Sequence, residues 1–134
     1  MRAVGEAFMS GTDLHEIHKE MDYAMKEIPH LMRQFNAVIL ALREMEKPVL
    51  AAVHGLVAGM GMSLMLAADL VMASDSTRFS LNYCNFGTSP AGGVSFNLPR
   101  LVGNKKAMEL LLLSEVFDAE TALRLGLINW RVPK

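Results

Sequence analysis

The chain has 134 residues, a formal net charge of −1, 51% hydrophobic residues and 7% aromatic residues. This near-neutral balance excludes a typical nucleic-acid-binding protein, because phosphate recognition needs a clustered excess of Lys and Arg. The single cysteine, Cys84, excludes an internal disulfide and favours a reducing compartment. A chain of this length is expected to form one domain that spans residues 1–134.

Helix and strand patterns alternate along the chain, with boundaries at Gly and Pro. Thr12 or Asp13 is a candidate N-cap for the first helix, and Pro29 is expected to interrupt that helix. In chain order, the predicted elements are a loop at 5–11, helices from near 14 and at 30–45, a strand at 49–53, a glycine turn at 55–61, a helix at 62–68, strands at 70–73 and 77–80, a loop at 87–93, helices at 105–113 and 119–125, and a strand at 128–132. This alternation predicts an α/β fold.

Residues 49–68 contain no Asp, Glu, Lys or Arg, and they are numerous enough to cross a membrane as a helix. Pro48 before this stretch, with His54 and the glycines inside it, favours a buried strand, a glycine loop and a buried helix instead. The N-terminus has no apolar h-region of a signal peptide. We therefore expect no membrane partner and a cytoplasmic location.

The segment from His54 to Ser63 is the candidate functional segment. Its closely spaced glycines let a ligand approach the backbone, and the first N–H groups of the helix that follows are unpaired. Such a turn can bind a phosphate, or a carbonyl oxygen that becomes negative during a reaction. The spacing of Gly59 and Gly61 does not fit a dinucleotide motif, and the segment has no lysine for a P-loop. Two interpretations stay open here, an oxyanion hole and a turn whose small residues only allow close packing.

Segments with a recognisable order and spacing extend over nearly the whole chain. They are AFMSGTDL at 7–14, KPVLAAVHG at 47–55, GMG at 59–61, ADLVMA at 68–73, FS at 79–80, LPRLVG at 98–103, AETA at 119–122 and GLI at 126–128. Together these segments resemble the enoyl-CoA hydratase/isomerase (crotonase) family. The resemblance implies a crotonase-like spiral of ββα repeats. Family members carry further β-α units before these segments and a helical tail after them, so the chain is expected to be a fragment, an incomplete acyl-CoA-binding core.

The resemblance also implies a ligand, an assembly and a site. The ligand is an acyl-CoA thioester, with no further cofactor and no metal ion. The full-length protein is expected to form homotrimers or hexamers, in the peroxisome or mitochondrial matrix if the source is a eukaryote. Family oxyanion holes use backbone N–H groups at the positions of Thr12 and Met60, and the bulk of Met60 is expected to narrow the acyl pocket. The other substrate-binding positions implied are Ser10, Gly11, Asp13, Gly59 and Gly61.

The acid–base positions of the family are substituted in this chain. Family hydratases hold a water between two glutamates, at positions that are Ser63 and Tyr83 here, and isomerases use a carboxylate at the position of Ala91. A serine hydroxyl is a weak base and a tyrosine titrates near about pH 10, so a standard two-glutamate hydratase is not expected. Two functions stay open. One is a lyase or isomerase of fatty acid metabolism with atypical acid–base residues, and the other is a catalytically silent crotonase-fold binding or scaffold protein.

Other polar side chains have both a structural and a functional interpretation. His54 is expected to fix the glycine turn by hydrogen bonding rather than to act as a base, and Asp69 resembles a structural acid of the family. Cys84 is either a nucleophile without an identifiable base or, as for most lone cysteines, a small core residue. The spacing of His15 and His18 does not match the H-E-x-x-H zinc motif, which favours solvated helix residues over metal ligands.

Overall fold

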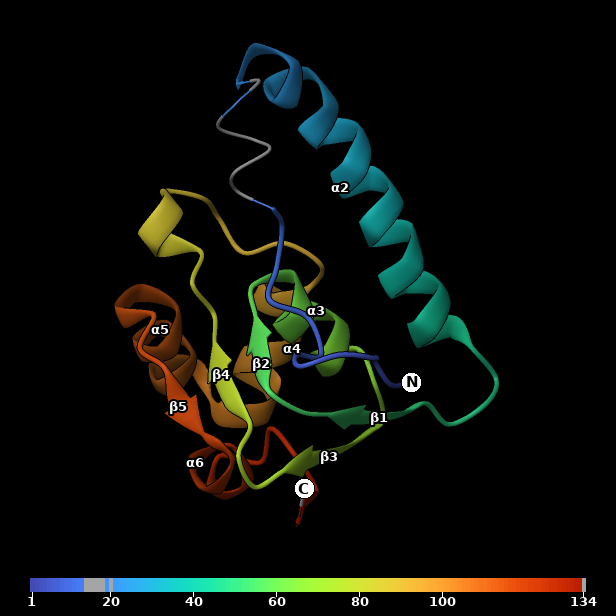
Figure 1. Cartoon of the computed structure of the whole chain (residues 1–134), viewed down its shortest axis with the longest axis vertical. Coiled ribbons are helices and arrows are strands. Elements are labelled where there is room, and N and C mark those ends of the chain that lie inside the picture. Colours follow the sequence, from blue (N-terminus) through green and yellow to red (C-terminus); the bar gives the residue numbers. More distant parts are fainter. Residues whose placement is uncertain (14–18, 20, 134) are drawn as a thin grey trace.

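The computed structural model describes residues 1–13, 19 and 21–133 (Figure 1). The predicted helix start near Leu14 and the pair His15 and His18 lie outside these residues. Within the described part, two three-stranded sheets are surrounded by helices. The predicted α/β class is therefore confirmed.

The strands belong to two sheets of different character. Their bounds are β1 Leu50–Val53, β2 Leu56–Ala58, β3 Leu70–Ser74, β4 Arg78–Ser80, β5 Phe117–Asp118 and β6 Trp130–Val132. The first sheet has the order β1-β3-β6 and is parallel throughout, with Leu50 beside Leu70 and Met72 beside Trp130. The second has the order β2-β4-β5, in which β2 and β4 are parallel and β5 is antiparallel to β4.

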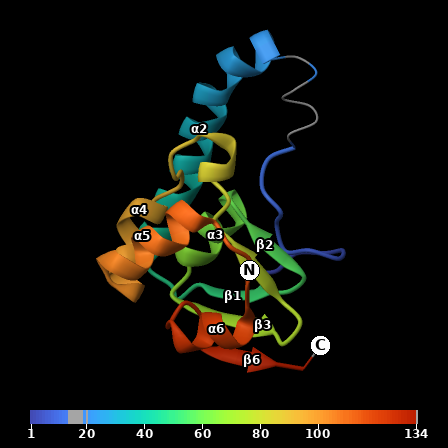
Figure 2. The ribbon, with the colours of Figure 1, turned by 90° about the vertical axis from the view of Figure 1, so that its left-hand side faces the viewer.

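The first four strands alternate between the two sheets, and a helical segment follows each of the pairs β1–β2 and β3–β4. Strands β1 and β2 precede α3 (Met60–Leu66), while β3 and β4 precede the 3₁₀ turn η1 (Cys84–Phe86) and α4 (Val94–Val102). Helix α5 (Asn104–Leu113) lies beside α4, and α6 (Ala119–Arg124) packs against β6 (Figure 2). This order confirms the ββα repeat expected from the sequence.

The core holds α3 rigidly behind the glycine turn. Met62 and Met65 of α3 are completely buried, and the ring of Phe79 in β4 stacks on that of Phe117 in β5 with centroids 5.5 Å apart. Complete burial of a large apolar side chain stabilises the fold by roughly 2–3 kcal/mol. The candidate oxyanion donor Met60 therefore lies at the start of a helix in which most residues are buried.

Helix α2 (Met21–Glu44) runs along one side of the molecule as one element (Figure 1). The predicted interruption at Pro29 is wrong, because Pro29 lies inside this helix. Proline has no backbone N–H, so one carbonyl of the helix loses its hydrogen-bond donor. Glu27, Pro29 and His30 are exposed, so this part of the helix is open to water, which can bind that carbonyl instead. Ile39 is buried against the body of the protein, whereas Val38 is exposed. No helix in the described part, α2 included, has the combined length and apolar character that a membrane crossing requires.

Three further elements differ from the sequence prediction. Residues 56–58 form strand β2 rather than part of the glycine turn, because they pair with β4. Helix α4 was not predicted, since Gly93 at its start and Pro99 within it obscure the helical spacing of its buried residues Val94 and Leu98. Strand β5 is only two residues long, which is too short for a period-2 pattern to reveal.

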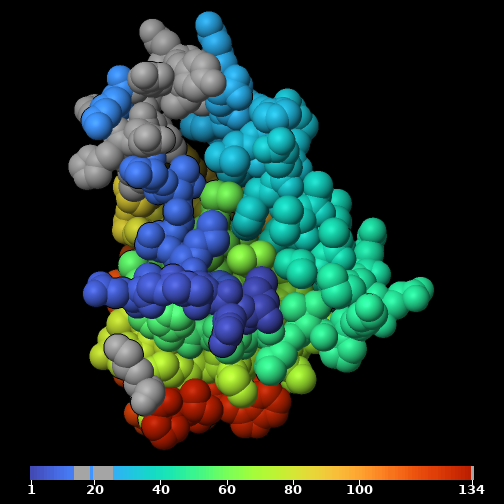
Figure 3. Space-filling model, turned by 45° about the vertical axis from the view of Figure 1, so that its right-hand side comes forward, coloured from blue at the N-terminus to red at the C-terminus, as the bar shows by residue number. Residues whose placement is uncertain are grey.

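The N-terminal segment (blue) lies over the part of the chain that contains the first strands (green), and α2 (cyan) lies beside it (Figure 3). Arg2 and Met9 form single β-bridges with Ala52 and Val57, and the Phe8 N–H donates to the His54 carbonyl at 2.9 Å. The ring of His54 lies with Nε2 2.9 Å from the Gly5 carbonyl oxygen. His54 therefore fastens the N-terminal segment beside the glycine turn, in agreement with its structural interpretation.

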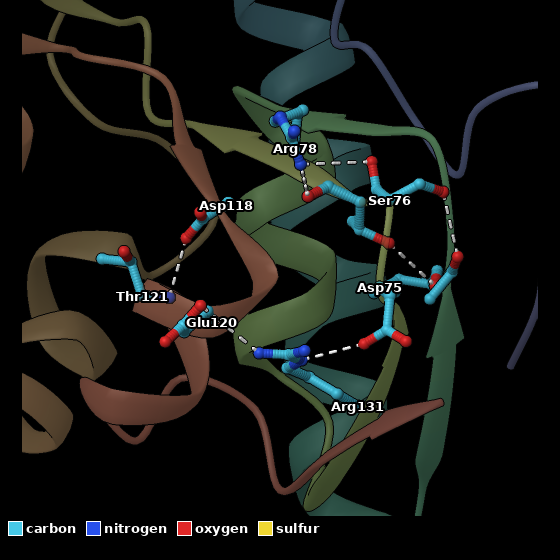
Figure 4. Close-up of polar contacts among 10 residues, drawn as sticks. Asp75, Ser76, Arg78, Asp118, Glu120, Thr121 and Arg131 are labelled. Carbon is cyan, nitrogen blue, oxygen red and sulfur yellow. Dashed lines mark hydrogen bonds and ion pairs between the residues drawn. The ribbon is translucent and has the colours of Figure 1, made fainter. Parts of the chain in front are cut away.

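Charged side chains join the last strand to the rest of the fold (Figure 4). Arg131 Nε donates to Asp75 at 2.8 Å, and Arg131 Nη1 lies 3.7 Å from a carboxylate oxygen of Glu120. Asp118 caps α6 by accepting the Thr121 N–H at 2.8 Å, and the hydrogen bonds from Thr121 hold the pKa of the Asp118 carboxyl below its ordinary value. These contacts fix α6 and β6 at one end of the two sheets.

Candidate functional site

A cavity of about 620 Å³ lies between the N-terminal segment, α2 and the chain that follows β4. Its volume is within the range of roughly 300–1,000 Å³ that is typical of small-ligand sites. The walls come from residues 10–12, from Ile28, Leu31, Met32 and Asn36 of α2, from residues 59–60, and from residues 81–83 and 86–91. Among these described lining residues there is no Asp, Glu, Lys, Arg or His, so the cavity wall they form is uncharged.

One wall brings together two segments that are far apart in the sequence. The Ala58 N–H donates to the Met9 carbonyl at 2.9 Å, and the Thr12 hydroxyl donates to Met60 Sδ at 3.1 Å. We call residues 10–12 and 59–60 the backbone wall. Among the described residues, the backbone N–H groups of Thr12 and Met60 have no hydrogen-bond acceptor. Two unpaired N–H donors therefore belong to one wall of the cavity.

Gly61 allows the two segments of the backbone wall to meet. A Cβ at this position would overlap the carbonyl oxygen of Met9, and a backbone atom held in a β-bridge cannot rotate away. Gly61 is buried behind the wall and does not line the cavity, whereas Ser10, Gly11 and Gly59 do. Asp13, the remaining residue expected to bind substrate, is exposed and also lies outside the described lining.

The three positions expected to hold catalytic acids also meet in space. Ser63 Oγ lies 2.7 Å from Tyr83 Oη and donates to the Ala91 carbonyl oxygen at 3.0 Å. Tyr83 and Ala91 line the cavity, whereas Ser63 is 0% exposed and lies behind them. We call Ser63 and Tyr83 the hydroxyl pair. The substituted residues are therefore connected to one another rather than scattered.

The hydroxyl pair is uncharged at neutral pH. Burial raises the pKa of the Tyr83 phenol above its ordinary value, and this effect exceeds the lowering by hydrogen bonds from Ser63 and the Ala91 backbone. A phenol whose pKa is raised stays protonated at neutral pH, so Tyr83 can donate or accept a hydrogen bond but is a poor base.

Gly92 packs closely against Ser63 of the hydroxyl pair. Its φ of +59° is unfavourable for residues with a side chain, and a Cβ there would lie 2.5 Å from Phe35 Cε1 and 2.7 Å from Ser63 Cβ. The loop therefore closes directly onto Ser63 and onto α2. Both the backbone conformation and the available space require glycine.

Sequence reasoning missed the contribution of α2 to the cavity. Ile28, Met32 and Asn36 recur every four residues, which places them on one face of the helix. This spacing could have predicted the contribution of α2, because a polar residue on the same helix face as apolar residues often faces a ligand or solvent rather than the core. The expected break at Pro29 concealed it.

Two other side chains can now be assigned. The Asp69 carboxylate accepts the Val49 N–H at 2.8 Å and so fixes the entry into β1, which supports its structural interpretation. Cys84 is exposed in η1 and lies outside the described cavity lining, so the expectation of a small core residue is wrong. The reason is local, since η1 is a short turn on the surface with no buried residue.

The order of the sequence segments suggested membership of a known family, and comparison with family models tests this. A family model described as enoyl-CoA hydratase/isomerase matches residues 1–134. The chain belongs to the enoyl-CoA hydratase/isomerase family. The crotonase fold is shown too, by an enoyl-CoA hydratase structure from Polaromonas sp. JS666 that superposes with a TM-score of 0.89 at 34% identity, over 96% of this chain and 50% of that one.

Curated relatives in the enoyl-CoA hydratase/isomerase family carry several activities in their names. A trans-2-decenoyl-[acyl-carrier-protein] isomerase from Streptococcus mutans is 33% identical over 96% of this chain and 49% of its own length. A 1,2-epoxyphenylacetyl-CoA isomerase from Escherichia coli is 32% identical over 98% of this chain and 50% of its own length. The chain thus spans about half the length of the curated relatives that it matches.

Proposed function

We propose that this chain holds an acyl-CoA thioester in the cavity, with the thioester carbonyl oxygen bound by the backbone N–H groups of Thr12 and Met60. The observation that carries the proposal is the backbone wall, in which Thr12 and Met60 from distant segments line the same cavity and their N–H groups have no acceptor among the described residues. Membership of the enoyl-CoA hydratase/isomerase family supports a thioester as the ligand. Ser10, Gly11 and Gly59 would contact the same ligand from this wall, and Asp13 and Gly61 would support it from outside.

The chemistry expected of such a site is polarisation of the thioester carbonyl. Two N–H donors aimed at one oxygen stabilise the negative charge that develops there, and removal of one donor typically costs about 3–4 kcal/mol of transition-state stabilisation. Hydration forms a thioester enolate when water adds to the β-carbon, and double-bond isomerisation forms one when the α-carbon loses a proton. Polarisation of the carbonyl stabilises the negative oxygen of this enolate in both reactions. The hydroxyl pair would supply polar contacts in place of the usual carboxylates, so we propose a hydratase/isomerase-type enzyme with atypical acid–base residues.

A second candidate function is a catalytically silent binding or scaffold protein with the same fold. The observation that favours it is the uncharged lining, since no carboxylate or histidine among the described lining residues could act as a general base. In this case the backbone wall would still hold the thioester, but no proton transfer would follow.

The experiment is incubation of the protein with crotonyl-CoA and with 3-enoyl-CoAs while the absorbance of the conjugated thioester is followed. Loss of that absorbance indicates hydration, and its appearance indicates isomerisation. Thioester affinity is measured in parallel by calorimetry. Binding without turnover would leave the silent function, and a protein that binds no CoA thioester would contradict both candidates.

We also propose a homotrimer or hexamer for the full-length protein, acting in fatty acid metabolism in the cytoplasm, or in the peroxisome or mitochondrial matrix of a eukaryote. Light scattering behind a sizing column tests the assembly directly. A monomer at all concentrations would contradict it.

A further inference from the structure

The parallel sheet β1-β3-β6 has one buried face and one open face. Successive side chains of a strand point to opposite faces, and Val53 and Val71 on the inner face are at most 4% exposed. On the other face, Leu50, Leu70 and Trp130 are 37–48% exposed. We call this open side the outer sheet face. Parallel sheets are normally covered on both sides, so an apolar surface of this kind is expected to have an occupant.

The strand register makes the outer sheet face continuous. One row across the sheet runs from Arg2 through Ala52 and Met72 to Trp130, because residues paired on adjacent strands project to the same side. The row therefore has a cation at one edge and a large aromatic side chain at the other. Trp, Met and Arg are enriched in protein–protein interfaces, where Trp and Arg most often carry the binding energy. This composition fits a protein partner.

Helix α2 carries an apolar stripe on the side away from the protein body. The stripe consists of Leu31 and Val38 in the helix and Met45 directly after it, at a spacing of seven residues that places them along one side. These side chains are 41–50% exposed, whereas Ile39 on the inner side is buried. Leu31 is at the margin, since it also lines the cavity. We call these three residues the outer stripe. It lies on the outside of the molecule, as α2 does in Figure 3.

The two apolar surfaces carry opposite charges at their margins. Glu27 lies one helical turn before Leu31, in line with the outer stripe. Glu27 and Arg2 are both exposed, and neither has an ion-pair partner among the residues that the structure describes. The net charge of −1 causes little repulsion between copies of the chain. The outer stripe and the outer sheet face are therefore complementary in both apolar character and charge.

We propose that the outer stripe of one copy of this chain docks on the outer sheet face of a second copy, with Glu27 paired to the partner's Arg2. Burial of the apolar side chains stabilises the contact, and the ion pair fixes which surfaces meet. The two surfaces differ, so each copy offers α2 to one neighbour and its sheet to another, and such contacts can close into a ring. This inference rests on the proposed self-association and not on the proposed ligand.

The test measures self-association of this chain by sedimentation velocity over a range of protein concentrations. Val38→Glu places a charge in the apolar contact and is expected to weaken association at least about tenfold. Trp130→Ala removes the largest side chain of the outer sheet face, and we expect a loss of about 30-fold or more. Leu112→Glu is the matched control with association unchanged, because Leu112 is an exposed apolar residue of α5 outside both surfaces.

A charge exchange tests whether the two margins face each other. Arg2→Glu and Glu27→Arg are each expected to weaken association about three- to fivefold. The double variant should return to within about twofold of the unaltered chain, since the pair is then reversed but intact. Arg33→Glu makes the same change of net charge on a different side of α2 and should leave association unchanged. All three positions are exposed, so these variants are expected to fold.

The outcomes are distinguishable. A chain that is monomeric at every concentration overturns the inference, and the two surfaces would then be left for other segments of a longer protein. Association that is unchanged in both Val38→Glu and Trp130→Ala also overturns it but leaves the proposed homo-oligomer standing, because the copies then meet elsewhere. A double charge variant as weak as the single ones overturns the pairing of these surfaces. Calorimetry with a CoA thioester on the same proteins decides the proposed ligand separately.

Discussion

The backbone wall and the hydroxyl pair enclose the same cavity but depend on the sequence in different ways. In the backbone wall, the groups proposed to bind the ligand are main-chain N–H groups, so side chains as different as Thr12 and Met60 are acceptable there. In the hydroxyl pair, the side chains themselves matter: Tyr83 lines the cavity, and the Ser63 hydroxyl is hydrogen-bonded to the Tyr83 hydroxyl. A side-chain substitution therefore leaves the N–H groups of the backbone wall in place, whereas it changes the chemistry of the hydroxyl pair.

The largest loss of stability is expected at Gly61, where the backbone wall has no spare space. Gly61→Ala places a methyl group against the Met9 carbonyl, and we expect a loss of about 3 kcal/mol in the free energy of unfolding. Urea denaturation measures it. Gly103→Ala is the control without a steric clash: a Cβ there meets nothing within 4 Å, so its left-handed φ of +79° should cost only about 1 kcal/mol. A Gly61→Ala protein as stable as the unaltered one would contradict the close approach of the two segments.

A smaller loss is expected where the neighbours are side chains. Gly92→Ala combines a left-handed φ with contact against Ser63 and Phe35, and side chains can shift in part. We expect a destabilisation of about 2 kcal/mol in urea denaturation. Gly87→Ala has a φ of +64° with open space around it, so it isolates the backbone component and should cost only about 1 kcal/mol. Equal losses in the two variants would mean that Gly92 is not packed against the hydroxyl pair.

Two matched substitutions at Thr12 test whether its backbone N–H binds the ligand, as proposed. Thr12→Pro removes the N–H, and we expect the affinity for a CoA thioester to fall about tenfold. Thr12→Val keeps the N–H and loses only the hydroxyl that contacts Met60 Sδ, so its affinity should change by no more than about threefold. Calorimetric titration distinguishes the two. A larger effect in Thr12→Val would assign the role to the side chain instead.

The smallest effect is expected far from both sites, at the cap of α6. Asp118→Ala removes the acceptor of the Thr121 N–H and should lower the Tm slightly at neutral pH. The pKa of the Asp118 carboxyl is lowered in the folded state, so its stabilisation is present above the unfolded-state pKa and is lost as the pH falls through the folded-state value. The difference in Tm between variant and unaltered protein should therefore shrink below about pH 4. Thioester affinity should not change.

Long, uninterrupted apolar patterns made much of the fold predictable. Strands β1 and β3 and helices α5 and α6 begin and end within two residues of the prediction, because buried parallel strands read as continuous apolar runs and Gly126 stops the last helix. Strand β2 exists because β4 lies beside it, and no local pattern encodes a partner. Helix α4 has Pro99 in its interior, so its stability comes from packing rather than from propensity.

The candidate site was predictable to a different degree in its two parts. The positions of Thr12 and Met60 followed from family segments that flank glycines, and the structure brings these two residues into contact. The bond between Ser63 and Tyr83 depends on how the loop around Gly92 folds back onto α3, which the sequence does not encode in any short motif. Its existence became visible only in three dimensions.

The contact between the two segments of the backbone wall closes a long loop of the chain. Thr12 and Met60 are 48 positions apart, and the intervening chain includes the whole of α2. The entropy lost on closing a flexible loop grows only slowly with its length, by about 0.6 kcal/mol for each doubling. Insertions or deletions near the start of α2 can therefore reshape the side of the cavity that Ile28 and Met32 form while the N–H donors keep their places.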